Sequence, residues 1–286
     1  MAEPPPRDDG LPRIDVLVPT CERPTALAAT LATLIGQTCR TFDVVVADQS
    51  DGEASFGTGE TAAIARLLRA RGNRVTLLRN LPRRGLAQQR QFLLDQSREP
   101  LVLFVDDDVL LEPDLIERLR RALMRSGAGF VGSAVIGLSF QADERPHQQA
   151  IEYWDGPVQP ECVAPDRPAW QRHHLHSAAN LWHVQQRCRD PGDRLYKVAW
   201  VGGCVLYDAA KLRECGGFGF WRELPIDHCG EDVMAQLRVM ERFGGCGLLP
   251  SGAYHQELAT TVADRRIDAP RVLLPAWEKM SHVARG

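Results

Sequence analysis

Apolar runs and amphipathic helical segments alternate through the first part of this chain, and this alternation limits the folds open to it. The apolar runs span residues 14–19, 44–47, 75–78 and 101–105, and helical patterns lie between them. Runs that are almost continuously apolar are typical of strands covered on both faces. Four alternations within about 110 residues predict a parallel sheet in an α/β layer fold. Right-handed crossovers then bring the loops that follow the strands to one edge of the sheet.

The most informative side chains at that edge are three consecutive acids. Asp106, Asp107 and Asp108 directly follow the run at 101–105. Residues i and i+2 of a strand share a face, so Asp106 and Asp108 are expected to point into one pocket, roughly 7 Å apart. Such carboxylates raise each other's pKa unless a cation neutralises them, and oxygen donors suit Mg²⁺ or Mn²⁺. A solvated acidic turn is the alternative, equally compatible with these residues alone.

Composition and charge exclude several classes of protein. The net charge of −3 and the pI near 6.3 give no basic face for a nucleic-acid partner. No apolar run approaches the ~20 residues that an integral membrane segment needs, and the N-terminus lacks a signal peptide. The eight cysteines are scattered without a C-x-x-C or disulfide pattern, so a cytoplasmic protein with free thiols is expected. Residues 1–12 have the composition of a disordered leader.

Two short patterns suggest other cofactors. Residues 127–132 match G-x-G-x-x-G, but they follow a helix and enter a strand, whereas a dinucleotide-binding loop does the opposite. The group His173, His174 and His176, with two cysteines and His183 nearby, matches no standard zinc spacing. We therefore interpret these histidines as part of a loop that faces solvent or substrate.

The second half of the chain is less regular. Residues 139–198 are polar and rich in tryptophan and histidine, and they predict an irregular insertion. Regular character returns at 198–206, and residues 270–283 are expected to form an amphipathic helix.

Two sites in this half carry residues suited to catalysis. Glu231 and Asp232 open a helix with an apolar face. Acids are common at such positions because the helix dipole stabilises them, and an ionised Asp232 is also what a general base requires. His255 ends an apolar run. A lone histidine is more often structural, but beside Asp108 it would complete a Mn²⁺ site.

Taken in order, these features resemble an inverting nucleotide-sugar glycosyltransferase of family two, which has the GT-A fold. The segments that carry the resemblance are 18–24, 46–51, Asn80 with Gly85, 87–90, 104–108 as the D-x-D motif, 202–203, 230–233 and His255. The resemblance covers residues 13–258. It implies a nucleotide-binding half over 13–136, an acceptor-binding half over 137–258 and a C-terminal helical extension over 259–286.

The resemblance also implies roles for individual residues. The donor would be bound by Pro19, Thr20, Arg23, Asp48, Gly85, Arg90, Asp106 and Asp107. Asp108 and His255 would hold Mn²⁺ or Mg²⁺ on the donor diphosphate, and Asp232 would be the catalytic base. The acceptor would contact Trp200, Gly203, Trp221 and Glu231, although tryptophans also fill cores. The chain departs from the family pattern in its short acidic turn at 48–51 and in its Arg-Gln pair at 90–91, both on the nucleotide side.

The expected function is metal-dependent transfer of a sugar from a nucleoside-diphosphate donor to an acceptor hydroxyl by single displacement. The acceptor stays open: a small molecule, a saccharide, a lipid-linked compound or a peptide. A sugar-phosphate nucleotidyltransferase is an alternative, but it needs a glycine-rich basic loop after the first strand, where this chain has residues 19–23. A nucleotide- or carbohydrate-binding module of the same fold, without turnover, is a further alternative.

Overall fold

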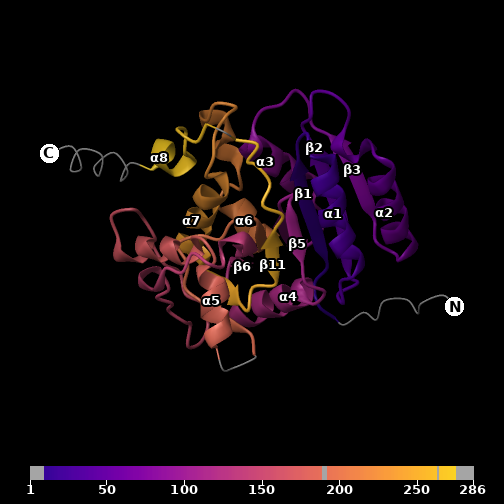
Figure 1. The fold of residues 1–286 in the computed structure, drawn as a ribbon. Helices are drawn as coiled ribbons and strands as arrows, with labels where there is room; N and C mark the ends of the chain where they lie inside the picture. Colours follow the sequence, from indigo (N-terminus) through magenta and orange to yellow (C-terminus); the bar gives the residue numbers. More distant parts are fainter. Residues whose placement is uncertain (1–9, 189–191, 263, 275–286) are drawn as a thin grey trace.

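The central element of the fold is a mixed sheet. The structure is a computed structural model that describes residues 10–188, 192–262 and 264–274 (Figure 1). Within these ranges, eight strands form the sheet in the order β3-β2-β1-β4-β9-β6-β10-β8. They are β1 (Ile14–Thr20), β2 (Phe42–Asp48), β3 (Val75–Arg79), β4 (Leu101–Val105), β6 (Phe130–Gly132), β8 (Arg194–Tyr196), β9 (Cys204–Asp208) and β10 (Gly245–Leu249). The first four run parallel, which confirms the α/β class predicted from the apolar runs.

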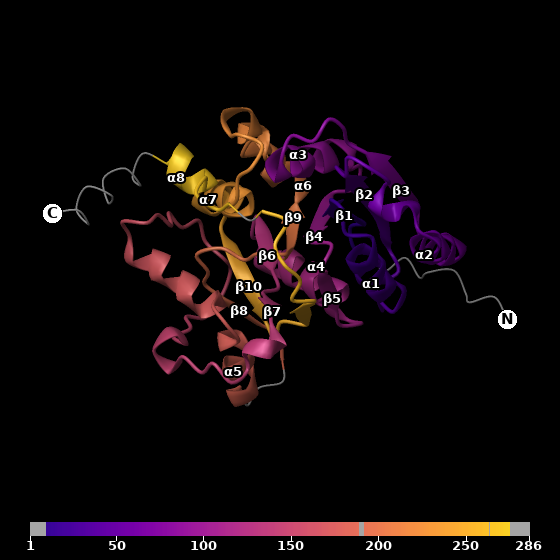
Figure 2. The same ribbon diagram turned by 45° about the horizontal axis from the view of Figure 1, so that its top comes forward.

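Helices cover both faces of this sheet. They are α1 (Pro24–Ile35), α2 (Gly59–Ala70), α3 (Leu86–Gln96), α4 (Leu115–Ser126), α5 (Asn180–Arg187), α6 (Ala209–Glu214), α7 (Glu231–Phe243) and α8 (Ala269–Leu273). Successive side chains of a strand point to opposite faces. Val16 and Val18 accordingly pack in the core formed with α1 and α4, whereas Leu17 packs in the core formed with α3 and α7. Figure 2 shows α1 and α3 on opposite sides of β1 and β4.

A second, three-stranded sheet joins the two halves of the chain. It contains β5 (Val109–Leu111), β7 (Val135–Ile136) and β11 (Ala253–His255), in the order β5-β11-β7. β11 runs antiparallel to β5, and His255 pairs with Val109 in the register. This pairing places the end of β11 beside the acids that follow β4.

One prediction for the second half needs correction, and one extends beyond the described residues. The expected strand at 198–206 begins only at Cys204. Gly203 has a φ of +78°, which breaks the extended conformation, and the Gln236 side chain satisfies the Val201 backbone in place of a neighbouring strand. The predicted C-terminal helix is represented by α8 alone, because residues 275–286, like most of the expected leader, lie outside the described ranges. In the described part of the chain, no helix is long and apolar enough to cross a bilayer.

Candidate active site

The carboxyl ends of β1, β2 and β4 meet at one edge of the sheet, as the alternation predicts. Thr20 and Asp48 are register partners at the ends of β1 and β2. The Thr20 hydroxyl donates to Asp107 Oδ2 at 2.6 Å, which ties the end of β1 to the acids after β4. Burial raises the pKa of Asp107 to about 7, although the Thr20 hydrogen bond and the charge of Arg23 oppose the shift.

Asp108 and His255 lie together, as the sequence predicted for a metal pair. His255 Nε2 is 3.6 Å from Asp108 Oδ2. Arg23 Nη1 lies 2.6 Å from the same oxygen and 3.4 Å from Asp107 Oδ1. Arg23 therefore supplies the positive charge next to both carboxylates, and its other nitrogen donates to the Ala259 carbonyl.

The atom types of this pair suit the expected cation, and a cation on Asp108 Oδ2 would have to displace Arg23 Nη1, which lies 2.6 Å from that oxygen. One carboxylate oxygen and one imidazole nitrogen suit Mn²⁺. His255 Nδ1 accepts a hydrogen bond from the Glu257 N–H at 2.6 Å. A neutral imidazole carries one proton, which this contact places on Nε2. Ligation through Nε2 therefore requires the Glu257 N–H to release Nδ1.

Asp106 faces a different partner, contrary to the expectation that Asp106 and Asp108 share one pocket. β4 ends at Val105, so strand alternation does not extend through the acids. Asp106 Oδ1 instead accepts from Arg90 at 2.7 Å, and its backbone N–H donates to the Gly203 carbonyl. Asp107 and Asp108 are the two acids that share a partner, which is Arg23.

Arg90 links the acids after β4 to the start of α7. Its side chain is 4% exposed, and its guanidinium donates through Nε to Glu231 Oε1 at 2.9 Å and through Nη2 to Asp106. The Glu231 side chain is equally buried, and its ion pair with Arg90 keeps it below the surface of the site. The sequence analysis expected Arg90 to contact the donor. In the structure Arg90 is buried, and its partner Asp106, whose side chain is 36% exposed, lies at the surface of the site.

Asp232 lies across a glycine turn from Asp106. A Cβ built on Gly202 would be 3.5 Å from Asp232 Oδ2, and one built on Gly203 would be 3.6 Å from Asp106 Oδ2. The two carboxylates therefore flank the Gly202–Gly203 turn. Burial and the adjacent Glu231 raise the pKa of Asp232 to about 7, against the opposing charge of Arg90.

Two other residues that were expected to bind the donor instead fix the conformation of the backbone around them. Asp48 is fully buried, and its carboxylate accepts from Ser50 and Ser55 in the loop after β2. Gly85 begins α3 with a φ of +88°, and a Cβ there would lie 2.3 Å from the Ile226 carbonyl and 2.6 Å from His228. Only glycine accepts both constraints. Pro19, paired with Ala47, sits within β1.

The two tryptophans expected at the acceptor lie in separate clusters of side chains. The Trp200 ring stacks on His173 with centroids 5.3 Å apart, and Trp170 is 5.0 Å from Trp200. Trp221 contacts the guanidinium groups of Arg84 and Arg222. His173 therefore belongs to an aromatic cluster, and the described residues hold no zinc-like grouping around it.

A cluster of three acids occurs at the opposite edge of the sheet. Asp15, Asp43 and Glu99 lie close enough to share an ion, within the described residues. Arg74 Nη2 is already 3.1 to 3.9 Å from a carboxylate oxygen of each. An arginine thus neutralises this cluster, and the strand ends that carry Thr20 and Asp106 are on the other edge.

Buried polar residues to which the sequence analysis gave no role of their own also organise the site. Gln89 donates to the carbonyls of Thr20 and Ala47, which joins the ends of β1 and β2. His228 Nε2 accepts from the Ala87 N–H at the start of α3. In the sequence, Gln89 could be noticed only as a polar residue between apolar positions of the helix that proves to be α3. For His228 no sequence pattern indicates the contact.

Comparison with protein families identifies the chain. The family model described as glycosyl transferase family 2 matches residues 15–195, which is more than half of the sequence. The chain belongs to glycosyl transferase family 2. The chain is also 27% identical over 127 residues to the uncharacterized protein y4gI of Sinorhizobium fredii, an alignment that covers 44% of this chain and 13% of that protein.

Solved structures share the GT-A fold of family 2. The crystal structure of S. aureus TarS 1-349 is 15% identical with a TM-score of 0.54, and the match covers 85% of this chain and 60% of that one. The mannosyltransferase PcManGT from Pyrobaculum calidifontis, in complex with GDP-Man and Mn²⁺, is 17% identical with a TM-score of 0.54 over 96% of this chain and 71% of that one. Identities this low establish the fold alone, and the chain spans less than two thirds of TarS 1-349 and about an eighth of y4gI.

Proposed function

We propose that this family 2 protein is a metal-dependent inverting glycosyltransferase that transfers a sugar from a nucleoside-diphosphate donor to an acceptor hydroxyl. The observation that carries the proposal is the position of Asp232, whose carboxylate faces the Gly202–Gly203 turn opposite Asp106. A general base is most effective when its pKa is near the working pH. The pKa of about 7 at Asp232 meets this requirement.

The donor side of the reaction would use the acids after β4. PcManGT was solved in complex with GDP-Man and Mn²⁺, and S. aureus TarS 1-349 in complex with UDP-GlcNAc; a donor of this class is proposed here. Asp106 and Arg23 would bind its nucleotide and diphosphate. When bound at Asp108 and His255, Mn²⁺ or Mg²⁺ would stabilise the negative charge of the departing diphosphate. The cytoplasmic location expected from the cysteines stays a prediction.

The proposed reaction is one displacement at the anomeric carbon. The acceptor oxygen forms a bond to that carbon while the bond to the diphosphate oxygen breaks, and the leaving group takes the bonding electrons. Asp232 accepts the proton of the acceptor hydroxyl, and Arg90 and Glu231 hold the start of α7 and Asp106 in register around the sugar. Attack opposite the leaving group inverts the anomeric centre.

The pH dependence of donor turnover tests this proposal. Nucleoside diphosphate release from UDP-, GDP- and dTDP-sugars in the presence of Mn²⁺ is measured between pH 5 and 9, with water as the acceptor. Asp232 acts only when ionised, so below its pKa of about 7 the rate is expected to fall about tenfold per pH unit, as for a single essential base. Glu231, Arg90 and Asp106 are the charged groups that face it. Absence of release from every donor, or a rate that stays level down to pH 5, contradicts the proposal.

A further inference from the structure

Residues 256–259, the segment after β11, are fastened to the first half of the chain. The Gln256 N–H donates to the Asp108 carbonyl at 2.8 Å, and its side-chain amide donates to a carbonyl of α1 at 3.1 Å. At the other end of the segment, the Ala259 carbonyl accepts from a nitrogen of Arg23. Both ends of the segment are therefore held beside the candidate cation pair.

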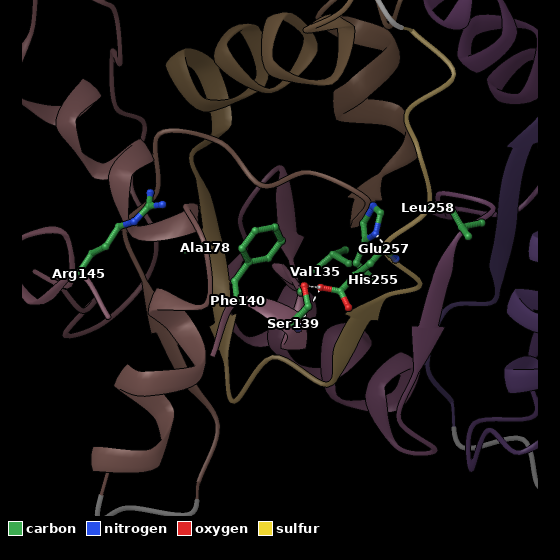
Figure 3. Close-up of a pocket in the computed structure, with 9 residues that line it drawn as sticks. Val135, Ser139, Phe140, Arg145, Ala178, His255, Glu257 and Leu258 are labelled. Atoms are coloured by element: carbon green, nitrogen blue, oxygen red, sulfur yellow. Dashed lines mark hydrogen bonds between the residues drawn. The ribbon is translucent and has the colours of Figure 1, made fainter. Parts of the chain in front are cut away.

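Within this segment, Glu257 is held in a conformation that its neighbours determine. Its φ is +58°, in the left-handed region that costs a non-glycine residue energy. Its N–H donates to His255 Nδ1, and its carboxylate accepts from the N–H and the hydroxyl of Ser139. Figure 3 shows Glu257 directed toward Ser139 at the wall of a pocket of about 430 Å³. The segment thus holds the His255 imidazole through Nδ1, the contact that a cation on Nε2 has to break.

Arg23 is the second obstacle to a cation at Asp108. Its side chain is 14% exposed, and Nη1 lies 2.6 Å from Asp108 Oδ2 and 3.4 Å from Asp107 Oδ1. A divalent cation on Oδ2 would stand close to this guanidinium, and two positive charges at short range repel strongly where water is scarce. Arg23 and the cation therefore compete for the same oxygen.

The two obstacles are linked, because Arg23 also holds Ala259. When Arg23 leaves Asp108, the Ala259 carbonyl loses its donor, and the segment that fixes Glu257 on His255 loses one of its attachments. A nucleoside diphosphate offers Arg23 another partner, since a guanidinium binds phosphate oxygens through two parallel hydrogen bonds that are charge-assisted.

We propose that Arg23 is an exchangeable counter-ion. Before the donor binds, it neutralises Asp108 and holds residues 256–259 in place. The donor diphosphate then draws Arg23 away, which frees Asp108 and His255 for the cation and releases the segment. Arg23 is thus a positioning residue that makes cation binding depend on the donor. The inference rests on the proposed function, because it needs a diphosphate at this site.

The test measures the binding of each ligand alone to the full chain. Mn²⁺ binding without nucleotide is followed by the electron paramagnetic resonance of the free ion. Binding of UDP, GDP and dTDP without metal is followed by calorimetry in EDTA. The variant is Arg23→Gln. The matched control for the loss of one positive charge is Arg121→Gln, at an arginine that is 69% exposed and pairs with Glu117.

Arg23→Gln is expected to change the two affinities in opposite directions. Mn²⁺ should bind at least tenfold more tightly, because the competing charge is gone. The nucleoside diphosphate that binds the parent should bind at least tenfold more weakly. Asp108→Asn in the Arg23→Gln background should abolish the gain in Mn²⁺ affinity, and Arg121→Gln should change neither affinity. A damaged fold would weaken both ligands and does not produce this result.

A measurement on the parent chain tests the release of the segment without any substitution. Hydrogen exchange of the peptide that contains residues 256–259 should become faster when Mn²⁺ and the nucleoside diphosphate are added together. The reason is that the Glu257 N–H loses its acceptor on His255. Mn²⁺ alone should leave the exchange unchanged.

Three results would overturn the inference: a Mn²⁺ affinity that does not rise in Arg23→Gln, nucleoside diphosphates that bind the parent no better than this variant, or exchange over 256–259 that is unchanged or slower. Release of diphosphate from a nucleotide sugar to water is read separately in the parent with Mn²⁺. If this turnover is present, a negative result at Arg23 leaves the proposed function standing. If it is absent for every donor, the proposed function itself fails.

Discussion

Asp232→Asn is expected to lower the rate of sugar transfer by about 10²- to 10⁴-fold, the contribution of a positioned general base. The amide keeps the shape of the carboxylate and the hydrogen bond that Asp232 Oδ1 accepts from the Val233 N–H. It removes the group that takes the acceptor proton. Donor affinity should stay within a few-fold, because the donor contacts proposed here come from β1, β4 and β11. Turnover with a nucleotide sugar and calorimetry with the matching nucleoside diphosphate measure the two effects.

Stability separates a catalytic effect at Asp232 from a damaged fold. The pKa of Asp232 is raised in the folded chain, so the folded state holds this proton more tightly than the unfolded state does. The side chain therefore costs stability as the pH rises through about 4 to 7. Asp232→Asn should be at least as stable as the parent at pH 8. Asp268 is a half-buried acid near the same helix start. The control is Asp268→Asn, which is expected to retain turnover. Normal turnover in Asp232→Asn would eliminate the assigned role.

Arg90→Met is expected to reduce the free energy of unfolding by about 3–5 kcal/mol, the usual cost of leaving one partner of a buried ion pair alone. Arg90 and Glu231 are each about 4% exposed, and their ion pair spans 2.9 Å. The variant leaves the Glu231 carboxylate without its partner in the core. It also removes the donor to Asp106, so this carboxylate beside the glycine turn loses its side-chain partner. Urea unfolding at pH 7.5 gives the free energy.

Two further variants identify the cause of that loss. In the double variant Arg90→Met with Glu231→Met, both charges are absent, so most of the stability should return. Arg121→Met removes an exposed pair with Glu117, in which the arginine is 69% exposed, and should cost no more than about 1 kcal/mol. If the double variant is less stable than either single variant, the ion pair is not the source of the effect.

The sequence was sufficient to predict the layers of the fold. Apolar strands and helical periodicity are local patterns, and β1, β2 and β4 begin and end close to the predicted residues. The apolar segment 198–206 shows what a local pattern does not determine. Its residues are apolar, but the turn at Gly203 and the bonds from Gln236 replace strand pairing over the first part. These are tertiary contacts that a local pattern does not contain.

The sequence predicted which residues belong to the candidate site better than it predicted the contacts between them. Asp108 and His255 meet because β11 pairs with β5, and the resemblance to family 2 anticipated this where spacing alone did not. Glu231 was expected at the acceptor, and its pairing with Arg90 across the core had no sequence signal beyond a charge on an apolar helix face. The partner of a buried charge is set by packing between distant elements, so only the structure reveals it.

The most direct test of the account is a thermal-shift measurement with UDP, GDP, dTDP and CMP, each with and without Mn²⁺, on the parent chain and on Asp108→Asn. A ligand that binds only the folded state raises the melting temperature. The account predicts that one nucleoside diphosphate stabilises the parent chain in a Mn²⁺-dependent manner, and that Asp108→Asn abolishes the Mn²⁺-dependent part. No shift with any nucleotide, or an equal metal-dependent shift in Asp108→Asn, would contradict the placement of donor and cation at Asp108 and His255.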